Sequence, residues 1–223
     1  MLFRLRINFQ KHDRLRLLAH LELVRAMERV IRRAQLPYAV SQGFNAHMKH
    51  APGPALPVGS AGLDEYFDVW LNEYIRPEEV LARLKAASVD GLSPIGVQYV
   101  PTSLRGLAAT HVHEEYEVVL ESDEEIPGGA GQVEESLTTL IAAGELSVAR
   151  KKKTKIYDLN VAVEAKPVVT AVAGTNEVSV NLKMKSAEQG SVKPEVLIGT
   201  ALGESSPFSI KSVTRTKLYS DEN

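Results

Sequence analysis

Two hydrophobic periodicities follow one another along this chain in an order that leaves few folds open. Alternating apolar and polar residues indicate half-buried strands, whereas apolar residues repeated every three or four positions indicate helices with one buried stripe. The first helical stripe is expected to begin with Leu17 and Leu21. The elements predicted for the first half, in the order βαββαβ, are strands at 3–9, 38–40, 67–71 and 95–99 and helices at 17–34 and from Pro77.

The second half repeats this order with additions. A helix is predicted between residues 133 and 141, and Gly144 is suited to end it. A short helix begins at Pro194. The strands predicted here are 116–120, 146–148, 159–163, 168–172, 178–184 and 208–210.

The pattern therefore predicts an α+β protein of two tandem ferredoxin-like (βαββαβ) units with antiparallel sheets. A single mixed α+β domain with an extended sheet is the alternative. The expected domains are residues 1–102, which include a Gly/Pro-rich loop at 41–62, and residues 114–223, joined by a linker at 103–113.

Composition excludes several classes of site. The chain has no cysteine, so it holds no disulfide scaffold, no Cys-ligated zinc, no thiol nucleophile and no Cys-held iron–sulfur cluster. No apolar run approaches the ~18 residues of a membrane-spanning helix. Charges are interleaved with apolar residues from Arg4 onward, unlike a secretory signal. We expect a soluble, cytoplasmic protein with no membrane partner.

The net charge of −2 conceals a segregation of charge. Residues 1–50 hold ten basic residues against three acidic ones, and residues 150–155 read RKKKTK. Such blocks of positive charge suit a polyanionic partner. The alternative interpretation is that the arginines form a solvated helix face, with the last of them capping the backbone carbonyls at the end of the helix. The candidate RNA- or phosphate-binding residues are Arg4, Arg6, Arg25, Arg29, Arg32, Arg33, Gln42, Asn45, His47, Lys49, Lys151, Lys152, Lys153 and Lys155.

The loop at 41–62 contains four glycines and three prolines, so it cannot form a regular element over its length. We expect it to be ordered, with Phe44, Met48 and Leu56 as anchors. His47 is a weak candidate for a general acid or base. The pairs His47/His50 and His111/His113 have spacings at which two imidazoles could share a metal. No carboxylate lies close in sequence to the first pair, and no metal site is expected.

One stretch resembles a known family. The segment SQGFNAHMKHAPGPALPVG (41–59), preceded by LLAHLELVRAMERVIRRAQLPYAV (17–40), resembles a bacterial family of uncharacterised radical-SAM-linked proteins, which are encoded beside or fused to a radical SAM protein. The likeness covers residues 3–70 well. It differs at Asn45-Ala46-His47-Met48-Lys49, where the family has NPHPK, so two prolines that would stiffen the loop are absent.

The resemblance implies a radical SAM protein as partner. The iron–sulfur cluster and the SAM would then lie on that partner, with no cofactor on this chain. Duplicated ferredoxin-like units with a Gly-rich loop also resemble the RAMP-type RNA-processing proteins of CRISPR systems, which suggests a RAMP-like arrangement of the two units.

These observations support three hypotheses. The first is a non-catalytic accessory subunit that binds structured RNA and presents it to a radical SAM partner. The second is a metal-independent RNA-processing enzyme that uses His47. The third is a protein–protein docking module that uses the acidic stretch 114–125. The absence of GxGxxG, P-loop and GxSxG motifs counts against a nucleotide-dependent enzyme or a serine hydrolase. The first hypothesis predicts that the basic side chains gather around Asn45, His47 and Lys49 of the Gly/Pro-rich loop.

Overall fold

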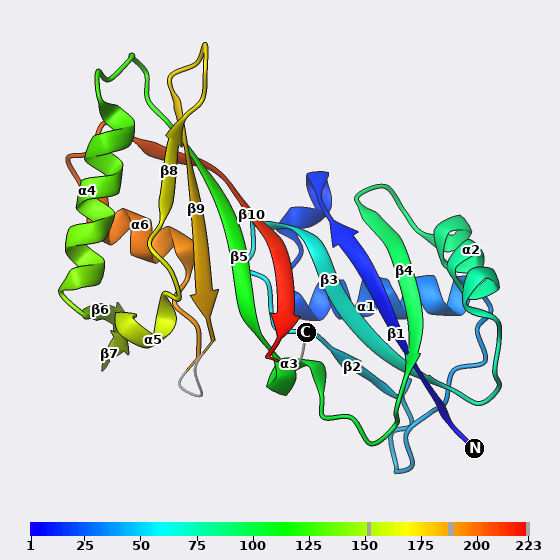
Figure 1. Cartoon of the computed structure of the whole chain (residues 1–223). Helices are drawn as coiled ribbons and strands as arrows, with labels where there is room; N and C mark the ends of the chain where they lie inside the picture. The colour runs from blue at the N-terminus through cyan, green and yellow to red at the C-terminus, as the bar shows by residue number, and fades with distance from the viewer. Residues whose placement is uncertain (151–152, 187–189, 222–223) are drawn as a thin grey trace. The chain divides into compact units, whose positions relative to one another are not determined.

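The computed structural model describes residues 1–150, 153–186 and 190–221, which form two compact units (Figure 1). Unit 1 consists of Met1–His111 together with the C-terminal segment that begins at Leu218, and unit 2 is Val112–Lys217. No helix among the described residues is long and apolar enough to cross a membrane.

Unit 1 is built on an antiparallel sheet in the order β4-β1-β3, with β2 paired to β3. The register places Leu5 opposite Val69 on β3 and Tyr99 on β4. The elements are β1 (Phe3–Lys11), a 3₁₀ turn (Asp13–Leu17), α1 (His20–Arg33), β2 (His50–Pro52), β3 (Ala61–Leu71), α2 (Pro77–Ala87), β4 (Leu92–Val100) and α3 (Leu107–Thr110).

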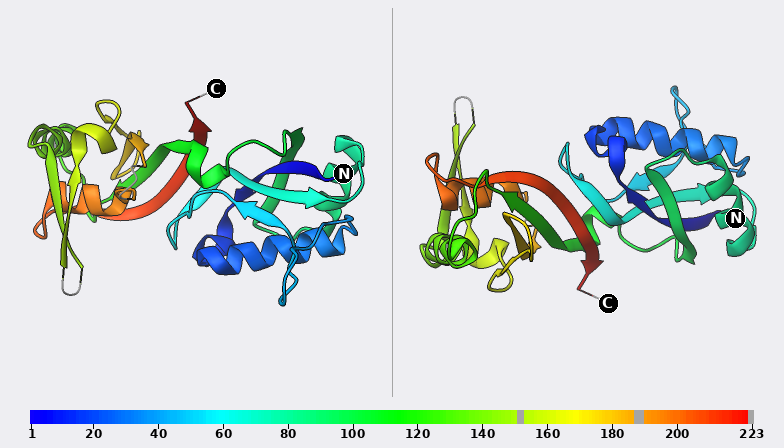
Figure 2. Two further views of the ribbon diagram at one scale, coloured as in Figure 1. Left: turned by 90° about the horizontal axis from the view of Figure 1, so that it is seen from below. Right: turned by 90° about the horizontal axis from the view of Figure 1, so that it is seen from above.

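The core of unit 1 lies between this sheet and its helices. Helix α1 covers one side of the sheet (Figure 2). Leu5 and Ile7 of β1 belong to the same core cluster as Met27 and Ile31 of α1, and all four are fully buried. Because side chains alternate along a strand, the residues between them on β1 face the other side of the sheet. Burial of these apolar side chains supplies most of the driving force that holds α1 on the sheet.

The predicted start of the first helix was wrong. Leu17 and Leu21 are 61% and 68% exposed, and the helix begins only at His20. The side chain of Glu22 accepts a hydrogen bond from the backbone N–H of Ala19 at 2.8 Å, which satisfies one of the free donors at this helix end. The buried stripe therefore begins at Leu23 rather than at Leu17.

The Gly/Pro-rich loop is anchored by two of its three predicted residues. Met48 and Leu56 are buried, whereas Phe44 is fully exposed and does not anchor anything. The short strand predicted at 38–40 is reduced to single bridges, Tyr38 to Leu71 and Val40 to Met48. The three-residue strand β2 lies within the loop, where only its tertiary pairing with β3 makes it a strand.

Unit 2 contains a sheet in the order β10-β5-β9-β8 and a separate hairpin of β6 and β7. Strand β9 is antiparallel to both of its neighbours, β5 and β8. Helices α4 and α6 pack against each other on this unit (Figure 1). The elements are β5 (His111–Glu121), α4 (Gly129–Ala142), β6 (Glu145–Arg150), β7 (Lys153–Asp158), α5 (Leu159–Ala162), β8 (Val168–Ala171), β9 (Glu177–Lys185), α6 (Pro194–Leu202) and β10 (Ser209–Ser220).

Two predictions for unit 2 were wrong in detail. Residues 159–162 form the short helix α5 instead of a strand, because the carboxylate of Asp158 accepts a hydrogen bond from the backbone N–H of Asn160 at 2.9 Å and caps the turn. The last strand runs from Ser209 to Ser220, far beyond the predicted 208–210. Both units combine antiparallel strand pairs with packed helices, so the protein is a mixed α+β protein with mostly antiparallel pairing.

Candidate nucleic-acid interface

Helix α1 presents four exposed arginines on the side turned away from the core. Arg25, Arg29 and Arg32 follow each other at steps of four and three, which puts them on one helix face, and Arg33 lies beside Arg32. Arg32 lies 3.5 Å from the carboxylate of Glu28 and its guanidinium carbon lies 5.9 Å from the ring centre of Tyr38. We call Arg25, Arg29, Arg32 and Arg33 the arginine face.

The segment 40–48 folds back on itself as a narrow tip. The backbone N–H of Ser41 donates to the carbonyl of His47 at 2.7 Å, and Val40 bridges to Met48 at its base. The Nδ1 of His47 lies 3.0 Å from Ser41 Oγ and 3.1 Å from the carbonyl oxygen of Asn45. With its proton on Nδ1 the ring donates to that carbonyl, which leaves Nε2 as an acceptor.

The tip exposes an aromatic ring between polar side chains. Phe44 is as exposed as a residue in an extended chain, and Gln42, Asn45 and His47 are exposed around it. An apolar ring held in solvent contributes little to folding, and this ring is accessible to a ligand or partner.

His50, which follows the tip along the chain, contacts the residue that also pairs with Arg32. The Nε2 of His50 lies 3.3 Å from a carboxylate oxygen of Glu28, the same carboxylate that contacts Arg32. Burial lowers the pKa of His50; the Glu28 carboxylate opposes this shift, and the positive charge of nearby His47 adds to it. Contacts therefore lead from the arginine face through Glu28 to His50, which follows the last residue of the tip by two positions along the chain.

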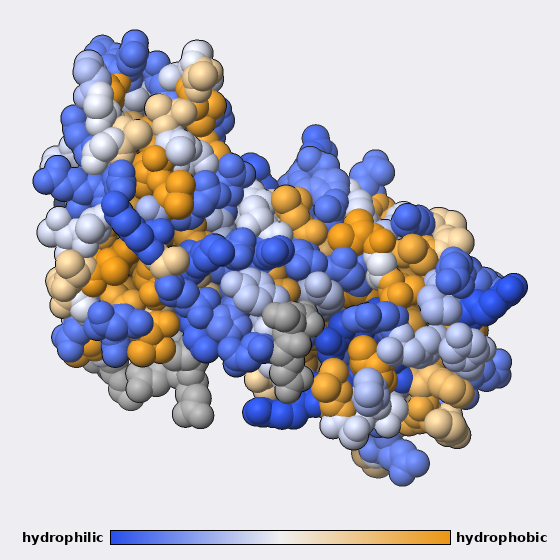
Figure 3. Space-filling model, in the orientation of Figure 1, coloured by the Kyte–Doolittle hydropathy of each residue, from blue (hydrophilic) through white to orange (hydrophobic). Residues whose placement is uncertain are grey.

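Lys49 lies on the opposite side of the sheet. Successive side chains of a strand point to opposite faces, and Lys49 extends over the ring of Trp70, with 5.2 Å between its Nζ and the ring centre, whereas His50 faces Glu28. In Figure 3, which shows the side of unit 1 turned away from α1, hydrophilic and hydrophobic residues are interspersed without a continuous patch of either kind. Lys49 is thus separated from the arginine face by the sheet.

Arg4 and Arg6 are buried, with 2% and 6% of their surfaces exposed. Both donate to the carboxylate of Asp68, which is fully buried, and Arg4 also donates to the backbone carbonyls of Leu104 and Arg105. They stabilise the fold and are not available to a phosphate. Asp68 was missed by sequence reasoning, and only the register of β1 with β3, which places it opposite Arg6, would have revealed it.

The lysine run is described only in part. Lys151 and Lys152 lie outside the described residues, and Lys153 and Lys155 lie on β7 of unit 2. Lys155 extends over the ring of Tyr157, with its Nζ 4.5 Å from the ring centre. The candidate residues that the structure places on the surface of unit 1, apart from Lys49, therefore form the arginine face and the tip.

The histidine pairs are not assembled as metal sites. His113 lies 2.7 Å from the carboxylate of Glu164, and His111 is buried against the ring of Tyr66, with 5.1 Å between ring centres. Nowhere in residues 1–150, 153–186 and 190–221 do three His, Asp or Glu side chains gather as metal ligands would.

Comparisons with known proteins agree with the fold. Residues 4–194 match the family described as uncharacterised proteins conserved in bacteria (DUF2344). No curated protein matches this chain. A chain in the crystal structure of a Cbf5–Nop10–Gar1 complex is 12% identical with a TM-score of 0.50, over 97% of this chain and 50% of that one.

Two further solved structures are more distant. A chain of the archaeal box H/ACA sRNP Nop10–Cbf5 complex is 12% identical with a TM-score of 0.47, over 97% of this chain and 49% of that one. An unknown protein from Galdieria sulphuraria is 14% identical with a TM-score of 0.27, over 82% of this chain and 81% of that one. The chain spans about half the length of the Cbf5-complex chains it matches. At 12% identity, the likeness to the first of these chains concerns the fold alone.

Proposed function

We propose an RNA-binding function for this chain, which belongs to the DUF2344 family of uncharacterised proteins conserved in bacteria. The observation that carries the proposal is the exposed arginine face of α1, linked through Glu28 to His50, which follows a tip that holds a fully exposed Phe44 among polar side chains. In this function the protein binds RNA and presents it to a radical SAM partner.

The two parts of the surface suit different parts of an RNA. Guanidinium groups pair with phosphates, and this contact releases counterions, so the affinity falls steeply with salt. An exposed aromatic ring stacks on a base that is not itself stacked, which is how proteins recognise single-stranded loops and ends. The combination therefore favours an unpaired RNA segment whose phosphates follow α1 and one of whose bases stacks on Phe44.

The partner is supported by the resemblance of residues 17–59 to proteins encoded beside or fused to a radical SAM protein. A chain without cysteine cannot hold the cluster by thiolates, so the cluster and SAM belong to the partner in this proposal. Co-purification of the radical SAM protein encoded beside this chain tests that part, and failure of the two to associate under conditions where each is folded would remove it.

We also propose that the two units are tandem ferredoxin-like units in a RAMP-like arrangement. It is supported by the element order within each unit. Unit 1 has β4-β1-β3 with β2 beyond β3, and unit 2 has β10-β5-β9-β8. In each unit, a helix follows the strand that comes first in the chain, α1 after β1 and α4 after β5. Another helix precedes the strand that comes last in the chain, α2 before β4 and α6 before β10.

Fluorescence anisotropy with a labelled 12-nucleotide single-stranded RNA, titrated at several salt concentrations, tests RNA binding. We expect the double variant Arg25→Gln/Arg29→Gln to bind more weakly, with the slope of log affinity against log salt reduced by about 1.4, or about 0.7 per lost phosphate contact. Phe44→Ala should cost about 1–3 kcal/mol of binding with an unchanged slope.

Arg76→Gln is the matched control, because Arg76 is also exposed on unit 1 but lies outside the arginine face and the tip. It should leave affinity and slope as in the wild type. No binding at micromolar protein, or equal losses from Arg76→Gln and from the double variant, would refute the proposal. Association with the radical SAM protein in the absence of RNA binding would instead support a docking module.

A further inference from the structure

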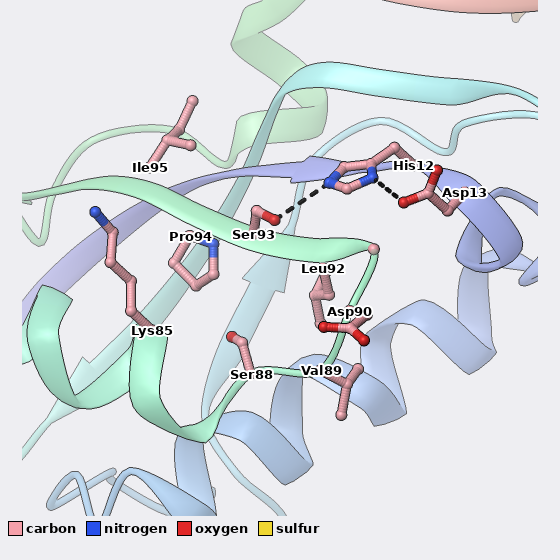
Figure 4. A pocket seen from close by; sticks show the side chains of 11 residues that line it. His12, Asp13, Lys85, Ser88, Val89, Asp90, Leu92, Ser93, Pro94 and Ile95 are labelled. Carbon is pink, nitrogen blue, oxygen red and sulfur yellow. Dashed lines mark hydrogen bonds and ion pairs between the residues drawn. The ribbon is translucent and has the colours of Figure 1, made fainter.

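A hollow of about 670 Å³ opens at one end of the unit 1 sheet (Figure 4), and no residue of the arginine face or the tip lines it. It lies where β1 ends, where the loop after α2 passes and where β4 begins. Its polar lining residues are His12, Asp13, Lys85, Ser88, Asp90 and Ser93.

Three of these side chains form a hydrogen-bonded chain. The Nδ1 of His12 lies 2.7 Å from Oδ2 of Asp13, and the Nε2 of His12 lies 3.2 Å from Oγ of Ser93, as the dashed lines of Figure 4 mark. With the proton on Nδ1, the ring donates to the Asp13 carboxylate and accepts from the Ser93 hydroxyl. This is the order of bonds that activates a serine nucleophile.

The backbone around this chain is in uncommon conformations. Asp13 has φ of 50°, a left-handed conformation that non-glycine residues rarely adopt, and its carboxylate contacts the ring of the preceding residue. Gly91 has φ of 83°, and its carbonyl accepts from the His12 N–H at 2.9 Å. Left-handed backbone at non-glycine residues costs energy and clusters at functional sites.

We propose that Ser93, His12 and Asp13 form the triad of a hydrolase for small acyl esters. Ser93 and His12 are its catalytic residues, and Asp13 is a positioning residue that holds the His12 tautomer. Triads are recognised by geometry and not by sequence order, so the missing GxSxG motif does not exclude this one. His12 and Ser93 lie 81 positions apart in the sequence, and only the pairing of β1 with β4 brings them together.

The reaction proceeds in two steps. Ser93 Oγ bonds to the ester carbonyl carbon while its proton passes to His12 Nε2, and the tetrahedral oxyanion then collapses, breaking the bond to the alkoxide, which takes that proton and leaves as an alcohol. Water next adds to the acyl carbon and gives a proton to His12. The bond to Ser93 breaks, Oγ recovers the proton, and a carboxylic acid is released.

The walls of the hollow suit a small acyl group. Val89, Pro94 and Ile95 line it with apolar side chains.

Two backbone donors at the hollow can serve a developing oxyanion. Asp90 and Gly91 line the hollow, and within the described part of the chain no group accepts a hydrogen bond from their backbone N–H groups. None of the four arginines of the RNA proposal lines this hollow, so the two proposals stand independently.

A fluorophosphonate probe followed by intact mass and peptide mapping tests the nucleophile, and hydrolysis of p-nitrophenyl acetate tests turnover. We expect one adduct on Ser93, no adduct in Ser93→Ala, and losses of at least about 100-fold in turnover for Ser93→Ala and His12→Gln. Ser88→Ala is the matched control, because Ser88 lines the same hollow without contacting His12.

Asp13→Asn tests positioning, because Asn tolerates left-handed backbone as well as Asp does. We expect kcat to fall at least about 100-fold with KM unchanged. The control is Asp123→Asn, an exposed aspartate of unit 2 that does not line the hollow, and it should leave kcat as in the wild type. Circular dichroism verifies that each variant is folded. The proposal is overturned by labelling that survives in Ser93→Ala, by wild-type turnover no faster than the buffer reaction, or by equal losses in Ser88→Ala and Ser93→Ala.

Discussion

Arg6 and Asp68 face each other across β1 and β3 in a two-point ion pair, with the Arg6 Nε 2.9 Å from Asp68 Oδ1 and its Nη2 3.1 Å from Oδ2. The same carboxylate also accepts from Nε and Nη2 of Arg4, at 2.9 and 2.7 Å. One buried carboxylate thus serves two buried guanidinium groups, and its removal would leave both without their charge partner.

Asp68→Asn should therefore lower the free energy of unfolding by about 3–5 kcal/mol, the usual result of breaking a buried ion pair on one side. Urea denaturation at pH 7 measures this. Asp123→Asn is the control, since Asp123 is exposed and its side chain should matter by less than about 0.5 kcal/mol. Equal stabilities of the two variants would show that the pair does not stabilise the fold.

His111 makes stability depend on pH. Burial, helped by the positive charge of Arg6, lowers the pKa of His111 to about 4, below its ordinary value of 6.5. A depressed histidine pKa means that the unfolded chain binds the proton more readily, so stability present above pH 6.5 is lost as the pH falls toward 4. The free energy of unfolding should drop by about 2 kcal/mol between pH 7 and pH 5 from this group alone.

Urea denaturation at the two pH values, in the wild type and in His111→Gln, isolates this contribution. The glutamine variant should lose less stability between pH 7 and pH 5 than the wild type, by about the same 2 kcal/mol. If both proteins lose the same amount, His111 is not the group responsible.

Gly91→Ala should destabilise unit 1 by more than about 1 kcal/mol, because alanine is strained at φ of 83° and its Cβ would lie 2.8 Å from the backbone oxygen of His12. Thermal or urea unfolding measures the change. Gly106→Ala is the matched control: φ there is −66°, and nothing lies within 4 Å of the added Cβ. It should be neutral or stabilising, and a similar loss in both variants would contradict this account.

Phe44→Ala should change the free energy of unfolding by less than about 0.5 kcal/mol, because the ring is fully exposed. Met48→Ala, four residues away, should cost about 2–5 kcal/mol, since Met48 is buried in the core. Differential scanning calorimetry of the two variants compares them directly. A large loss in Phe44→Ala would mean that the ring packs within the fold and is not free to stack on a ligand.

Local periodicity predicted most elements of unit 1. Alternation at residues 3–9 matches β1 (Phe3–Lys11), and the three-four spacing matches α1 from His20 onward. Both patterns work because burial on one side is a property of neighbouring residues along the chain. The pattern failed at Leu17 and Leu21, where apolar residues continue the spacing beyond the point at which the helix begins.

The candidate interface was predictable only in part. The exposure of Arg25, Arg29, Arg32 and Arg33 follows from helical spacing alone, because the buried stripe of the same helix leaves them on the opposite side. Arg4 and Arg6 looked equivalent in the sequence but are buried, since alternation shows that they share a face of β1 without showing what covers that face.

The sequence by itself determined most strands and helices of unit 1 and which face of α1 carries positive charge, because both depend on spacings of a few residues. Only the tertiary structure decided that Asp68 pairs with both Arg4 and Arg6, that His50 contacts Glu28 of α1, and that Ser93 meets His12. These contacts join residues that are remote in the sequence, and a hydrogen bond tolerates only a few tenths of an ångström. Strand register and chain reversal set such distances, and no local spacing encodes them.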